Sequence, residues 1–159
     1  MTKRKLNIFD KIGTLIPGYN GYAIRDEKRN SDKKLRLSIA KMIESSEREI
    51  IMHQQGLIRK NEIQSSQEWE IARKALNTIT TKIKNAAYGE SSFFSNEQIK
   101  EAELNELYEI DLELAERVDL ISKTITKNIT EVLSSTLVNQ QVREIDNILN
   151  KRVSFLNKF

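Results

Sequence analysis

The residues best placed to do chemistry in this chain are four charged side chains near its start and one carboxylate far from them. Arg25, Arg29, Asp32 and Arg36 recur at helical spacing, and at about 100° per residue they share a stripe about 60° wide. That stripe borders an apolar face and does not oppose it. Asp111 takes a position that the apolar repeat of a later helix would give to a leucine. These groups could pair with one another or bind an anion.

Burial distinguishes these alternatives, because an unpaired charge inside a protein is strongly destabilising. We therefore predict that Asp111 accepts a charge-assisted hydrogen bond from one of the three arginines in a network that fixes helix register. The predicted structural network comprises Tyr22, Arg25, Arg29, Asp32, Arg36, Tyr108 and Asp111. Two alternatives stay open, namely a site for a phosphate or carboxylate ligand and a set of solvated charges.

No other pattern favours catalysis or metal binding. His53 is the only histidine, and Glu49 lies one turn before it, but the further ligands of a helical-bundle metal site are missing. The carboxylate cluster of Glu109, Asp111, Glu113 and Glu116 is scattered around the helix axis and lacks a partner motif for general acid–base work. The absence of cysteine excludes thiol chemistry and disulfides. We predict a protein that is not an enzyme and uses no metal or other cofactor.

Helices must position these groups, because apolar residues recur at three- and four-residue spacing and no segment alternates like a strand. The expected helices cover residues 5–16, about 20 to the mid-50s, Ser65 to Tyr88, Ser95 to Ile125, and a last segment after Thr136. Ser65 and Ser95 are the expected capping residues. The predicted fold is all-α, an antiparallel bundle of three to four long helices with a short N-terminal amphipathic helix, related to coiled coils.

The chain divides at its only proline, Pro17. Residues 1–19 form an N-terminal amphipathic segment that ends in a Pro-Gly break, and residues 20–159 form the bundle domain. The apolar face of the first segment consists of Ile8, Phe9, Ile12, Leu15 and Ile16. We expect this face to dock on the bundle, with a lipid surface or a protein partner as the alternatives.

Charge is uneven along the 159 residues. Residues 1–36 hold ten Lys/Arg and four Asp/Glu, which is +6, and the other 16 Lys/Arg and 19 Asp/Glu give −3, for a total of +3. Such asymmetry favours an anionic partner or an internal pairing of the basic end. If a nucleic acid binds, the cations expected to contact its phosphates are Lys3, Arg4, Lys5, Lys11 and the exposed Lys28, Lys33 and Lys34.

Several short motifs resemble an uncharacterised family of small helical bacterial proteins. They are Gly18-Tyr19-x-Gly21-Tyr22-x-x-Arg25, then Ala87-Tyr88-Gly89 with Phe93-Phe94, and Leu107-Tyr108-x-x-Asp111. The resemblance implies a helical cytoplasmic protein and assigns no catalytic residue.

The function that these observations favour is a non-catalytic helical interaction module that binds a protein partner or a second copy of itself. It would act in the cytoplasm, with peripheral contact to a membrane surface as a variant of the same role. The alternative is a nucleic-acid-binding protein that uses the basic N-terminal quarter, although no recognition motif accompanies the charge.

Overall fold

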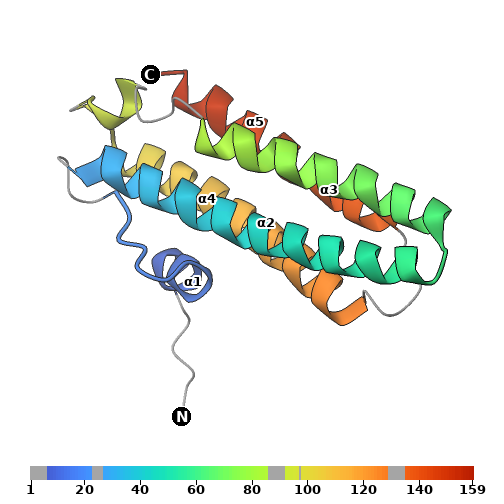
Figure 1. Ribbon diagram of the computed structural model, residues 1–159. Helices are drawn as coiled ribbons and strands as arrows, with labels where there is room; N and C mark the ends of the chain where they lie inside the picture. The colour runs from blue at the N-terminus through green and yellow to red at the C-terminus, as the bar shows by residue number, and fades with distance from the viewer. Residues whose placement is uncertain (1–6, 23–26, 86–91, 97, 129–134) are drawn as a thin grey trace, which may run out of the picture.

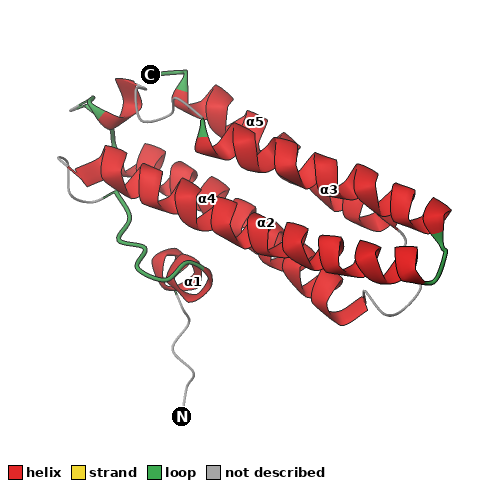
Figure 2. Cartoon of the chain, viewed as in Figure 1, coloured by secondary structure: helices red, strands yellow, loops and turns green. Residues whose placement is uncertain are grey.

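The computed structural model describes residues 7–22, 27–85, 92–96, 98–128 and 135–159. Within these ranges the chain forms five α-helices, one short 3₁₀-helix and no strand (Figures 1 and 2). The helices are α1 (Ile8–Leu15), α2 (Lys28–Arg59), α3 (Ile63–Lys84), η3 (Ser92–Phe94), α4 (Glu101–Asn128) and α5 (Ser135–Leu156). The predicted all-α bundle with a short N-terminal helix is therefore confirmed.

Two antiparallel hairpins build the bundle. In the first, α2 and α3 run in opposite directions, since Glu47 pairs with Arg73 while Gln54, further along α2, bonds the earlier Ser66. The second hairpin, α4 and α5, is antiparallel in the same way (Figure 1).

The two hairpins stack so that helices running in the same direction are neighbours. Asp32 and Asp111 bind the same guanidinium near the beginnings of α2 and α4, and Glu49 bonds Thr126 near their ends. Helices α2 and α4 are thus parallel neighbours, and so are α3 and α5, which also pack together. The short helix η3, which stands between α3 and α4 in the sequence, lies at one end of the bundle (Figure 1).

The first residues of α3 and α4 differ from those predicted. Helix α3 begins at Ile63, so Ser65 lies inside the helix and does not cap it. Helix α4 begins at Glu101, where the Lys100 N–H donates to Glu103 Oε2 at 2.7 Å. Ser95 lies before that helix and its expected capping role is wrong. Of the break expected at residues 134–136, Ser135 and Thr136 lie within α5, and Ser134 lies outside the described residues.

The core is a continuous apolar interior drawn from every helix. Trp69 of α3 is buried as expected, and the aromatic residues of η3 close one end of the bundle. Phe93 packs against Phe155 and Phe159 with ring centroids 5.5 and 5.2 Å apart. Tyr88, assigned to the same loop by the sequence, lies outside the described residues.

Candidate functional site

The Gly-Tyr repeat after α1 fastens the N-terminal segment to the bundle. Gly18 and Gly21 adopt left-handed φ values of 80° and 70°, which favour glycine. A Cβ atom on Gly21 would lie 2.4 Å from Phe9 Cε2 and 2.7 Å from the Tyr108 hydroxyl. The tight turn therefore lets α1 pack closely against α4 and directs the tyrosine that follows it, Tyr22, into the interior.

Tyr22 is the centre of a buried hydrogen-bonded cluster. Its backbone N–H donates to the Tyr108 hydroxyl at 2.8 Å. Its own hydroxyl donates to Asp111 Oδ2 at 2.6 Å and accepts from Arg152 Nη2 at 3.0 Å. The turn is thereby joined to both helices of the second hairpin.

Ion pairs extend this cluster across the bundle. Arg152 Nε donates to Asp111 Oδ1 at 2.8 Å, and its Nη1 lies 2.7 Å from Asp32 Oδ1. The other oxygen of Asp32 accepts from Arg36 Nε at 2.9 Å, and Arg36 Nη1 donates to the carbonyl of Ile83 in α3 at 2.9 Å. All four long helices thus meet in one polar layer, which we define as Tyr22, Asp32, Arg36, Asp111 and Arg152.

The pKa shifts in the polar layer arise from burial and from the interactions of its members with one another. Burial raises the pKa of the Asp111 carboxyl, and Arg152 opposes that shift. Burial also works against a charged Arg152, but the nearby carboxylates, Asp111 foremost, raise the pKa of Arg152 well above its ordinary value. Burial and Asp111 together raise the pKa of Tyr22. A tyrosine held so firmly in its protonated form is a hydrogen-bond donor here and a poor base or nucleophile.

Asp111 has an arginine partner that the sequence analysis did not name. It pairs with Arg152 of α5, which was not among the three arginines of the N-terminal stripe. Arg29 is exposed, Arg36 joins the layer through Asp32, and Arg25 lies outside the described residues. The predicted proximity of Tyr22 and Tyr108 is confirmed by the bonds given above.

Arg152 was not predicted to belong to this network, although it occupies an apolar position in the helical repeat of α5. Ile145, Leu149, Arg152 and Leu156 follow one another at intervals of four, three and four residues, and all are buried. Arg152 has 1% of its surface exposed, so it interrupts the apolar face of α5 as Asp111 interrupts that of α4. This interruption would have added Arg152 to the candidate partners of Asp111.

The N-terminal apolar face is not a free binding surface. Ile12 and Ile16 are fully buried, Ile8 and Leu15 are half-buried against the core, and Phe9 packs on Tyr19 at a centroid distance of 5.5 Å. The bundle covers most of this face, as expected, and Phe9 keeps 36% of its surface exposed. The assignment of these residues as a candidate partner or membrane face is therefore corrected.

Two other candidates from the sequence have structural roles. His53 packs edge-on against Trp69 with ring centroids 5.3 Å apart, and burial lowers its pKa. Lys28, expected to be exposed, is buried with 8% of its surface accessible. No group of three His, Cys, Asp or Glu side chains that could hold a metal occurs in the described ranges.

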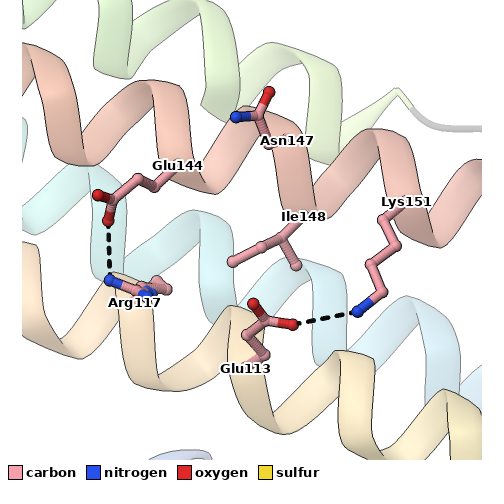
Figure 3. Close-up of a pocket in the computed structure, with 6 residues that line it drawn as sticks. All are labelled: Glu113, Arg117, Glu144, Asn147, Ile148 and Lys151. Atoms are coloured by element: carbon pink, nitrogen blue, oxygen red, sulfur yellow. Dashed lines mark hydrogen bonds and ion pairs between the residues drawn. The ribbon is translucent and has the colours of Figure 1, made fainter.

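An accessible groove lies on another part of the surface, between α4 and α5. One section of about 440 Å³ is lined by Ala102, Asn105, Glu106, Glu109, Ile110, Glu113 and Lys151. A second section of about 300 Å³ shares Glu113 and Lys151 with the first and is also lined by Arg117, Glu144, Asn147 and Ile148. Figure 3 shows the side chain of Ile148 between the pairs Arg117–Glu144 and Glu113–Lys151. The groove has an apolar floor and charged rims.

No family model, curated protein or solved structure matches this chain. The family resemblance carried by the Gly-Tyr repeat consequently stays a prediction. In the part of the chain that the structure describes, no helix combines the length and apolar character needed to cross a lipid bilayer.

Proposed function

We propose that this protein is a non-catalytic helical interaction module that binds a protein partner along the α4–α5 groove in the cytoplasm. The observation that carries the proposal is the chemistry of that groove. Glu106 and Glu109 are exposed on its α4 rim, and neither forms an ion pair with another described residue. Glu113 has only a long contact of 3.5 Å with Lys151. The rim is thus an acceptor for cationic groups.

The partner that fits such a groove carries a lysine or arginine. The aliphatic stem of either side chain can pack on Ile110 and Ile148, while its charged end meets the carboxylates of the rim. A groove between two helices also favours an elongated protein segment over a compact ligand. The polar layer supports this role because its paired charges hold α4 and α5 in a fixed register beneath the groove.

Affinity capture with a charge-reversed groove tests the proposal. The tagged full chain, a Glu106→Lys/Glu109→Lys variant and a control Glu62→Lys/Glu68→Lys variant are incubated with cytoplasmic extract at two salt concentrations. Both variants change the net charge equally, but the control residues lie on the exposed surface outside the groove. Circular dichroism establishes that all three are folded.

We expect a protein that the native chain and the control retain, that the groove variant loses, and that high salt weakens. Recovery of the same proteins by the groove variant would contradict the proposed surface. Recovery of nuclease-sensitive material in place of a protein would favour the nucleic-acid alternative.

A further inference from the structure

The outward surface of α2 has a one-sided charge. Six of its side chains are exposed cations, namely Arg29, Lys33, Lys34, Lys41, Arg48 and Arg59, and none has an ion-pair partner among the described residues. No acidic side chain between residues 28 and 59 is fully exposed.

The acids of α2 are bound within the protein. Asp32 belongs to the polar layer, and Glu47 pairs with Arg73 at 2.9 Å. Glu44 pairs with Lys84 of α3, and Glu49 accepts a hydrogen bond from Thr126 of α4 at 3.0 Å. Among the described residues, none of these four acids forms an ion pair with any of the six exposed cations.

Large apolar side chains lie among these cations. Leu37, Ile51, Met52 and Ile58 have between 37% and 70% of their surface exposed. At about 100° per residue, the cations and apolar side chains share an arc roughly 140° wide on one side of α2. We call this arc the basic face; Glu44 lies within it, paired with Lys84.

We propose that the basic face is a peripheral docking surface for an anionic lipid bilayer. Cations attract anionic headgroups, and exposed Leu, Ile and Met side chains can enter the interfacial region between them. The cations from Lys33 to Arg59 extend over roughly 39 Å at 1.5 Å per residue. A flat and extended anionic surface meets all of them at once.

A nucleic acid fits the same face less well. It would use the cations, but it leaves the four apolar side chains without a complementary surface. The segment from residue 28 to 59 also contains no Phe, Tyr or Trp that could stack on bases. A bilayer uses both chemical features of the face.

The proposal goes beyond the protein-binding groove and can coexist with it. Helices α2 and α5 are diagonal in the bundle, and the groove follows the α4–α5 edge. Docking through α2 thus leaves the groove accessible. With few apolar side chains and no spanning helix among the described residues, the expected attachment is reversible.

Vesicle flotation with the purified full chain tests this inference. One set of vesicles is pure phosphatidylcholine, and the other is an equimolar mixture of phosphatidylcholine and phosphatidylglycerol. We expect binding to the anionic vesicles only, with release as salt rises from about 0.1 M to 1 M and the screening length falls from about 10 to 3 Å. Equal binding to both vesicle types, or none to the anionic vesicles, would overturn the proposal.

Two charge-matched triple variants identify the surface. Lys33→Gln/Lys41→Gln/Arg48→Gln removes three cations from the basic face. Lys74→Gln/Lys100→Gln/Arg143→Gln removes three exposed cations from elsewhere on the protein. We expect the first variant to bind at least about tenfold more weakly than the native chain and the control to change less than about twofold. Equal losses would show attraction to net charge alone and would overturn the assignment to α2.

Two further variants test the contributions of apolar contact and of the basic N-terminus. Ile51→Ser/Ile58→Ser should weaken vesicle binding about threefold or more, because it removes interfacial contacts from folded protein. Lys3→Gln/Arg4→Gln/Lys5→Gln should leave most of the binding; its complete loss would assign the attraction to residues 3–5 and refute the α2 surface.

A labelled DNA duplex provides the competing anionic surface. If the duplex binds through the α2 cations and displaces the protein from vesicles at equal phosphate concentration, the face prefers nucleic acid and the proposal fails. Because the groove charge reversal leaves α2 intact, its vesicle binding is expected to persist. The two proposals can therefore fail separately.

Discussion

Replacing Arg152 by methionine removes the cation that joins the two halves of the polar layer. The native guanidinium contacts Asp111 at 2.8 Å, Asp32 at 2.7 Å and the Tyr22 hydroxyl at 3.0 Å. Both carboxylates have 0% of their surface exposed. In the variant, Asp32 keeps Arg36, but Asp111 keeps only the hydroxyl of Tyr22 among the bonds described above. The substitution therefore leaves a buried anion without its counter-ion.

The expected loss of unfolding free energy is about 3–5 kcal/mol, the range for breaking one side of a buried ion pair. For a domain of this size, each kcal/mol lowers Tm by about 2–4 °C, so Tm should fall by roughly 6–20 °C. Methionine occupies part of the vacated volume, so cavity formation contributes little of this loss.

Urea unfolding followed by circular dichroism measures the loss. Arg143→Met is the matched control on α5, and because Arg143 is exposed it should change stability by no more than about 0.5 kcal/mol. Asp111→Asn combined with Arg152→Met should recover about 1–3 kcal/mol relative to the sum of the single changes. A loss below about 1 kcal/mol for Arg152→Met, or strict additivity, would refute the reasoning.

Three further outcomes are expected. Gly21→Ala should lower the free energy of unfolding in urea by about 1–3 kcal/mol, because the φ of 70° and the crowded Cβ position disfavour alanine. Gly13→Ala, on the open surface of α1, is the control and should be neutral or stabilising. Equal effects of the two substitutions would contradict this account. Ile12→Ala should cost about 2–5 kcal/mol in the same assay, and a loss under about 1 kcal/mol would mean that α1 does not dock in solution. Hydrogen bonds from Arg73 and Gln54 lower the pKa of Glu70 to about 2, so its contribution to stability is present above the ordinary pKa of 4.5 and is lost as pH falls towards 2. Solvent screening keeps that contribution small. An NMR titration should find the low pKa in the native chain and a value near 4.5 in Arg73→Leu; an ordinary pKa in both would refute the assignment.

The sequence predicted the architecture because helix formation depends mainly on local periodicity. The interruption at Asp111 is visible in the same periodicity, so its burial and its need for a counter-ion could be inferred. Its partner could not be selected from local spacing, because Arg36 and Arg152 both lie on apolar faces of their helices. Only the stacking of the two hairpins decides which guanidinium reaches the carboxylate.

The N-terminal segment shows a different limit of sequence reasoning. Amphipathic spacing indicated that one face of α1 would be covered, but a bundle, a membrane and a partner all satisfy the same pattern. The deciding contact is the close approach at Gly21, which depends on Tyr108 of α4. The basic face of α2 likewise depends on which of its acidic side chains form ion pairs with neighbouring helices. Spacing along the sequence could not predict that Glu44 pairs with Lys84 or that Glu47 pairs with Arg73.

The hydrogen bond between Tyr22 and Arg152 closes a loop of 130 positions along the chain. Each hairpin can form from contacts between consecutive helices, whereas this bond requires the first and last parts of the fold to meet. We therefore expect this bond to form late on the folding pathway, after most local contacts. A bond that forms late changes the folding rate little and slows unfolding, so we expect the polar layer to lengthen the kinetic lifetime of the fold.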